Sequence, residues 1–208
     1  MSPVDPLALF QPAVRDWFAA SFGGPTLPQG RGWPPIARGE STLILAPTGS
    51  GKTLSAFLWC LDRLMFAEPP PPARRCRVLY VSPLKALAAD VERNLRAPLA
   101  GIAQCARRRG DAYATPAIAV RSGDTPAADR ARFRREPSDI LITTPESLYL
   151  LLTSGARDTL RAIETLRLAR TELERQLAAT THTGRRAQLG LAMEEIERRM
   201  KEMRASGC

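Results

Sequence analysis

Residues 46–53 read Ala-Pro-Thr-Gly-Ser-Gly-Lys-Thr. Just before them lies a short apolar run, residues 42–46, and after them apolar side chains recur every three or four positions from Leu54 to Met65. The run is typical of a buried parallel strand, and the recurrence is typical of an amphipathic helix. A glycine-rich loop between a strand and a helix is the context of a phosphate-binding loop, where backbone N–H groups converge on phosphate oxygens.

Each part of this loop has an expected role. The glycines let the backbone approach a β-phosphate, Lys52 reaches the β- and γ-phosphates, and the Thr53 hydroxyl completes the shell of a Mg²⁺ ion. The first position of the general pattern is Ala46 instead of glycine, and a glycine-rich turn without a ligand is the alternative. The expected ligands are ATP and Mg²⁺, and the expected nucleotide-binding residues are Pro47, Thr48, Gly49, Ser50, Gly51, Lys52 and Thr53.

Working outward, strand and helix patterns alternate. Upstream, an amphipathic helix is expected from Pro6 to Phe18, followed by a Gly- and Pro-rich loop at residues 23–35. Downstream, strands are expected at residues 78–81, 117–120 and 140–143, and helices at 84–95, 126–135 and 145–152. This alternation predicts an α/β fold with a parallel sheet covered by helices on both faces, which binds ligands at the carboxyl ends of its strands.

Three of these strand ends share one construction. Ser82-Pro83, Thr125-Pro126 and Thr144-Pro145 each place a hydroxyl before a proline where a helix is expected to begin. A hydroxyl N-cap followed by proline at the first helical position is a common helix start, and helix N-termini bind anions. Lys85 adds a positive charge nearby. The three ends therefore predict a row of anion sites, although well-capped helices without a ligand are the alternative.

Composition limits the function classes. The formal net charge is +9, and only three of the 30 basic residues are lysines. An arginine surplus favours a polyanionic partner, although a GC-rich genome also raises arginine content. The four cysteines form no CxxC pair and His182 is the only histidine, which argues against a metal site or a disulfide framework. Cys60 falls in a helical apolar pattern and is expected to be a buried structural thiol. No signal peptide or membrane span is evident, so a cytoplasmic location is expected.

The last part of the chain has a different pattern. No proline follows Pro145, and apolar residues keep a heptad frame. We expect a helical hairpin over residues 158–205, which either packs locally or binds a protein partner. The residues of this frame are Leu166, Leu173, Leu177, Leu189, Met193, Ile196, Met200 and Met203.

Four motifs in order resemble those of superfamily-two helicases, and the combination is most similar to the large helicase-related (Lhr-type) DNA helicases. They are residues 46–53, 81–87, 121–125 and 143–148, and the resemblance runs from about Phe10 to Thr165. It implies a RecA-like motor domain in which Gln29 reads adenine, with Phe22 stacking nearby. It also implies sequence-tolerant binding of single-stranded DNA or RNA through Ser82, Pro83, Lys85, Gly123, Asp124, Thr125, Thr144, Pro145, Glu146 and Ser147.

One departure from the family concerns catalysis. The family carries an Asp-Glu pair at the end of a further strand, where this sequence has Ala169 and Arg170. We therefore expect a partial motor domain at residues 1–165, a helical tail unrelated to the family at 166–208, no catalytic residues and little hydrolysis by this chain alone. The alternative function is a non-enzymatic binding module whose tail recruits a partner.

Overall fold

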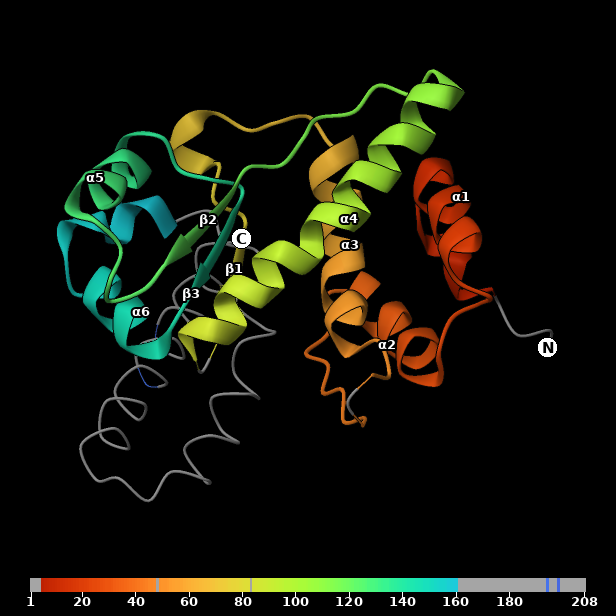
Figure 1. Cartoon of the computed structure of the whole chain (residues 1–208), viewed down its shortest axis with the longest axis horizontal. Helices are drawn as coiled ribbons and strands as arrows, with labels where there is room; N and C mark the ends of the chain where they lie inside the picture. Colours follow the sequence, from red (N-terminus) through yellow and green to blue (C-terminus); the bar gives the residue numbers. More distant parts are fainter. Residues whose placement is uncertain (1–4, 48, 83, 161–193, 195–197, 199–208) are drawn as a thin grey trace. The chain divides into compact units, whose positions relative to one another are not determined.

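The structure is a computed structural model that describes residues 5–47, 49–82, 84–160, 194 and 198 (Figure 1). Its chain divides into two compact units. The first contains Met1–Pro69 and Arg93–Pro116, and the second contains Pro70–Glu92 and Ala117–Cys208. The long helix α4, Lys85–Arg109, contributes its first residues to the second unit and the rest to the first.

The first unit is built around aromatic side chains. Phe10 and Phe18 meet the ring of Trp33 edge to face, with centroids 4.9 and 5.6 Å apart. Trp33 is fully buried, and its indole N–H donates to the Ser55 carbonyl at 3.2 Å. The helices that supply these contacts are η1 (Pro6–Leu9), α1 (Pro12–Ser21), α2 (Leu27–Ala37) and α3 (Lys52–Phe66).

Helix α2 corrects the loop expected at residues 23–35. The Gly- and Pro-rich composition suggested a loop, but Pro28 lies in the first helical turn, where a missing N–H costs no intrahelical bond. Thr26 and Gln29 form a capping pair at its start, in which Gln29 Oε1 accepts the Thr26 N–H at 2.9 Å. Pro34 and Pro35 are tolerated near its end.

The expected strand at residues 42–46 is also wrong. This segment is not in a strand, and Leu43 and Leu45 are 58% and 79% exposed. Among the described residues it pairs with no other strand, and an extended backbone needs a neighbouring ladder to become a strand. Within this segment, Ile44 lies against the backbone of Gly32.

The second unit contains the sheet. Within the described residues it has three parallel strands in the order β1-β3-β2, namely Val78–Val81, Ile140–Thr143 and Ile118–Arg121. All four residues of the central strand β3 are buried. The predicted α/β fold and these strands are confirmed, with β2 displaced by one residue. Helices α5 (Ala127–Arg135) and α6 (Pro145–Leu152) lie beside the sheet in Figure 1, and η2 (Pro72–Arg74) and η3 (Gly155–Leu160) complete the unit.

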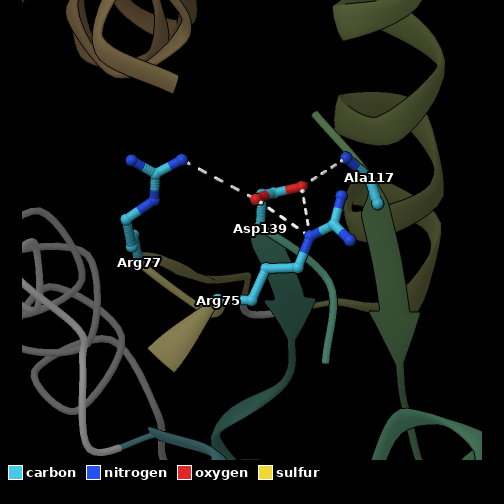
Figure 2. A network of polar contacts seen from close by, with 4 residues as sticks. All are labelled: Arg75, Arg77, Ala117 and Asp139. Atoms are coloured by element: carbon cyan, nitrogen blue, oxygen red, sulfur yellow. Dashed lines mark hydrogen bonds and ion pairs between the residues drawn. The ribbon is translucent and has the colours of Figure 1, made fainter. Parts of the chain in front are cut away.

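Asp139 joins the amino ends of the three strands (Figure 2). Its carboxylate accepts the Ala117 N–H at 2.7 Å and the Arg75 Nε–H at 3.2 Å, and it lies 3.7 Å from Arg77 Nη2. Its backbone carbonyl also accepts the N–H groups of Arg77 and Val78, each at 3.1 Å. Asp139 is 3% exposed, so a buried charge with several partners holds this end of the sheet together.

The expected C-terminal hairpin over residues 158–205 lies outside the described residues except for residues 158–160, which belong to η3, and residues 194 and 198. None of the helices in the described part is long and apolar enough to span a bilayer.

Candidate nucleotide and nucleic-acid sites

The loop at residues 46–53 leads directly into helix α3, as expected. Gly49 and Gly51 have φ angles of 83° and 80°, which side-chain-bearing residues rarely adopt. Gly51 is the N-cap of α3, and a Cβ there would lie 2.6 Å from Gln29 Nε2. A glycine is therefore required at position 51 both by the backbone angle and by the close neighbour. Thr48 lies outside the described residues.

The positive charge of this loop, on Lys52, is held by backbone carbonyls of the same loop. The Lys52 ammonium donates to the carbonyls of Ala46 and Pro47. The Pro47 carbonyl also accepts the Ser50 hydroxyl at 2.7 Å. These carbonyls are neutral acceptors, and charged phosphate oxygens are stronger ones, so an arriving phosphate can take the ammonium from them. Thr53 lies exposed in the first turn of α3.

The segment before α2 is attached to the same loop. The Thr26 hydroxyl donates to the Ser50 carbonyl at 3.0 Å, and the Ser55 hydroxyl donates to the Gly51 carbonyl at the same distance. Gln29 is 3% exposed and lies against Gly51. The structure therefore brings Gln29 to the loop, while its Oε1 is occupied by Thr26. The role of Thr26 was missed in the sequence, although the spacing Thr-x-x-Gln is a capping signature.

The strand ends form one edge, as expected, because all three strands are parallel and in register. Of the three expected N-caps, Thr144 is confirmed: its hydroxyl accepts the Ser147 N–H at 3.4 Å, and Pro145 begins α6.

The other two caps are wrong. Helix α4 begins at Lys85, and the Ser82 hydroxyl donates to the Leu84 carbonyl at 3.1 Å instead of accepting a helical N–H. Thr125 accepts the Ser122 N–H at 2.8 Å and closes a turn, so Pro126 takes the N-cap position of α5. In both cases a local turn satisfies the hydroxyl before the helix begins.

Burial separates the expected nucleic-acid residues into two groups. The hydroxyls of Ser82, Thr144 and Ser147 belong to residues that are at most 5% exposed, and Pro145 is buried with them. The exposed group is Lys85, Gly123 and Asp124, with Thr125 and Glu146 half-buried. Pro83 lies outside the described residues. At this edge of the sheet, the charged side chains of Lys85 and Asp124 face solvent, whereas the hydroxyls of Ser82, Thr144 and Ser147 are buried.

The two exposed charges meet each other. Lys85 Nζ donates to Asp124 Oδ2, across the ends of β1 and β2. Their side chains are 54% and 77% exposed, so water screens this pair strongly. A phosphate group can replace the carboxylate of Asp124 as the partner of Lys85.

Two cysteines show no sign of reactivity. Burial raises the pKa of the Cys60 and Cys76 thiols to about 12. A thiol with so high a pKa is not a nucleophile at neutral pH. Cys60 is 5% exposed, which confirms the expected burial of this thiol.

Comparison with known proteins gives consistent results. Residues 26–169 match the family model described as DEAD/DEAH box helicase. The chain is 49% identical, over 93% of its length, to the Lhr helicase/probable uracil glycosylase of Mycolicibacterium smegmatis. It is 48% identical, over 91% of its length, to the Lhr helicase/uracil glycosylase of Escherichia coli. The chain spans 12% of the length of each of these two relatives.

A solved structure agrees with these relatives. It is the Mycobacterium smegmatis helicase Lhr bound to ssDNA and AMP-PNP, with a TM-score of 0.78 and 44% identity. The similarity covers 94% of this chain and 24% of that one. A second structure, the DUF1998 helicase MrfA bound to DNA and AMPPNP, shares the fold with a TM-score of 0.59 at 22% identity, over 74% of this chain and 19% of that one.

Proposed function

The chain belongs to the DEAD/DEAH box helicase family, in its Lhr-type branch, and from this premise we propose that it binds Mg-ATP and single-stranded nucleic acid as part of an ATP-dependent DNA helicase. The observation that carries the proposal is the loop at residues 46–53. Two left-handed glycines, a helix N-terminus and an ammonium held by replaceable carbonyl partners are brought together there.

On this proposal, Lys52 leaves the carbonyls of Ala46 and Pro47 and turns to the β- and γ-phosphates. The N–H groups at the start of α3 donate to the same phosphates. The exposed Thr53 hydroxyl would be a ligand for Mg²⁺, which would neutralise phosphate charge when bound. Gln29 would have to exchange its bond to the Thr26 N–H for the adenine edge, or else hold the loop in place while adenine binds elsewhere.

Nucleic acid binds at the carboxyl edge of the sheet in the second unit on this proposal. Lys85 and the backbone around Gly123 are exposed there. The buried hydroxyls of Thr144 and Ser147 hold the start of α6 in place instead of contacting the ligand. Contacts to the backbone alone carry no base preference, so binding should tolerate any sequence.

The chain alone should turn over ATP slowly or not at all. The resemblance places Ala169 and Arg170 where the family carries its Asp-Glu pair, and a motor needs such acids to hold Mg²⁺ and the attacking water. The alternative function is a non-enzymatic module that binds nucleotide and nucleic acid and whose helical tail binds a protein partner.

A multiple-turnover ATPase assay, with and without single-stranded DNA, tests this proposal together with titrations of a fluorescent ATP analogue and a labelled oligonucleotide. We expect saturable binding of both ligands with little turnover. Robust DNA-stimulated turnover would show that the inference from Ala169 and Arg170 is wrong. Absence of nucleotide binding would overturn the proposed function itself.

A further inference from the structure

Arg121 is the last residue of β2 and lies at the carboxyl edge of the sheet. It pairs with Thr143 in the ladder, and the Thr143 hydroxyl donates to its carbonyl at 2.8 Å, so its backbone is held firmly. Its Nη1 atom is buried and has no hydrogen-bond acceptor within the described part of the chain. A buried guanidinium N–H without an acceptor costs free energy of folding, so it is a candidate donor to a bound ligand.

Two further arginines approach Arg121 from helix α5. Arg130 and Arg134 are four residues apart, so they lie on one face of the helix. The Arg130 Nε–H donates to the Thr125 carbonyl at 2.9 Å, which ties this side chain to the turn that follows β2. Burial lowers the pKa of Arg121, and repulsion from Arg130 and Arg134 lowers it further. Arg130 and Arg134 therefore each lie near enough to Arg121 to disfavour its positive charge.

Among the described residues, no carboxylate offsets the effect of the two arginines on the pKa of Arg121. The ion pair found on α5 joins Arg132 to Glu136 at 3.7 Å, and Asp124 is paired with Lys85. Arg77, at the opposite end of the sheet, also has a buried nitrogen without an acceptor, but its guanidinium forms an ion pair with Asp139. Arg121 differs from Arg77 because it combines the unfilled donor with neighbouring like charges instead of an ion pair.

We propose that Arg121, Arg130 and Arg134 form a binding site for a backbone phosphate of single-stranded nucleic acid. The site rests on the proposed function and adds residues to it. Guanidinium groups match phosphate oxygens in geometry and charge, and a bound phosphate would fill the free donor and relieve the repulsion together. The site lies where parallel sheets bind ligands. Gly123 beside it is exposed with open space around its Cα, so a polymer backbone can approach closely.

A matched pair of double variants of the full chain tests this site. R130Q/R134Q removes two charges from the proposed site, and R132Q/R135Q removes two from other positions of the same helix. Binding of a labelled mixed-sequence oligonucleotide is measured by fluorescence anisotropy at several salt concentrations. We expect R130Q/R134Q to weaken binding about tenfold and to lower the log–log salt slope by about two. The control should change affinity less than about threefold.

Thermal unfolding provides a second readout. R130Q/R134Q removes repulsion together with one exposed hydrogen bond, so its melting temperature should stay close to that of the parent chain, whereas a structural role would lower it clearly. Equal loss of binding in both double variants would overturn the site, because it would show a response to net charge alone. If the parent chain binds the oligonucleotide and R130Q/R134Q binds it equally well, the site fails and the proposed function stands.

Two other outcomes also decide the question. If the parent chain binds no oligonucleotide at any salt concentration, both the site and the nucleic-acid part of the proposed function are wrong. If polyglutamate binds more tightly than the oligonucleotide, and only R130Q/R134Q abolishes that binding, the site recognises an acidic polypeptide and the phosphate assignment is wrong.

Discussion

The two ends of the parallel sheet use the same residue type for opposite purposes. At the amino end, Arg75 and Arg77 surround the buried carboxylate of Asp139, and this acid also receives a backbone N–H. At the carboxyl end, Arg121 has no acidic partner among the described residues and lies near further arginines. Paired charges in the interior hold strands together, whereas unpaired charges beside solvent are available for a ligand. We therefore assign stability to the amino end and binding to the carboxyl end.

Asp139→Ala should produce the largest effect on stability. It leaves the Ala117 N–H and two guanidinium groups without their acceptor, which should lower the free energy of unfolding by about 3 kcal/mol. Urea unfolding followed by circular dichroism measures this loss. The matched control is Asp124→Ala at the carboxyl end, where the carboxylate is 77% exposed and stability should hardly change. Equal losses from both variants would remove the distinction between the two ends.

Two variants at the carboxyl end test its assignment to binding. Lys85→Ala should lower the log–log salt slope of oligonucleotide binding by about one, because one phosphate contact is lost. Asp124→Ala should instead strengthen binding a few-fold, since it frees Lys85 from its carboxylate partner. Anisotropy titrations over a range of salt concentrations measure both. An unchanged slope for the first variant, or weaker binding by the second, would contradict the role assigned to this edge.

A smaller effect concerns Asp62, a buried acid with fewer partners than Asp139. One of its oxygens accepts the Gln11 N–H at 2.7 Å, and the other is buried without a partner in the described structure. Burial raises the pKa of Asp62, so the folded chain binds this proton more tightly than the unfolded chain. The carboxylate therefore costs stability above its folded-state pKa, and the cost disappears as the pH falls below the ordinary value of about 4.

Asp62→Asn should consequently raise the melting temperature near neutral pH, with a difference that shrinks as the pH falls. Glu40→Gln is the control, because the pKa of Glu40 is shifted in the opposite direction from that of Asp62. The hydrogen bond from Arg38 lowers the pKa of Glu40, so this carboxylate contributes stability that is lost as the pH falls. Its effect should be very small because the pair is exposed. A pH-independent difference for Asp62→Asn would show that the carboxylate is not strained by burial.

The sequence predicted the sheet well and the segment at residues 42–46 badly, and the reason is physical. Residues 42–46 and β3 are both short apolar runs between turn residues. Strand β3 pairs on both sides and is completely buried, whereas residues 42–46 pair with no described strand. The hydrophobic pattern of a segment indicates that it tends to be buried. Whether it forms a strand depends on hydrogen bonds to another strand, which lies far away in the sequence.

The candidate sites show a similar division. Residues 46–53 were predictable because glycine angles and loop chemistry are local properties. The Thr144 cap was predictable for the same reason, whereas Ser82 and Thr125 have equally good local partners in turns. The contacts of Thr26 with Ser50 and of Arg130 with Thr125 depend on the fold, so neither was expected from the sequence.

Residues 46–53 are proposed to bind the phosphates of ATP, and the affinity of a fluorescent ATP analogue for Lys52→Ala tests this proposal. This substitution removes the ammonium of the loop, so affinity should fall at least about tenfold, or about 1.4 kcal/mol. Lys85→Ala, in the other unit, is the matched control and should bind the analogue as the parent chain does. Unchanged nucleotide affinity in Lys52→Ala would contradict the assignment of this loop as the nucleotide site.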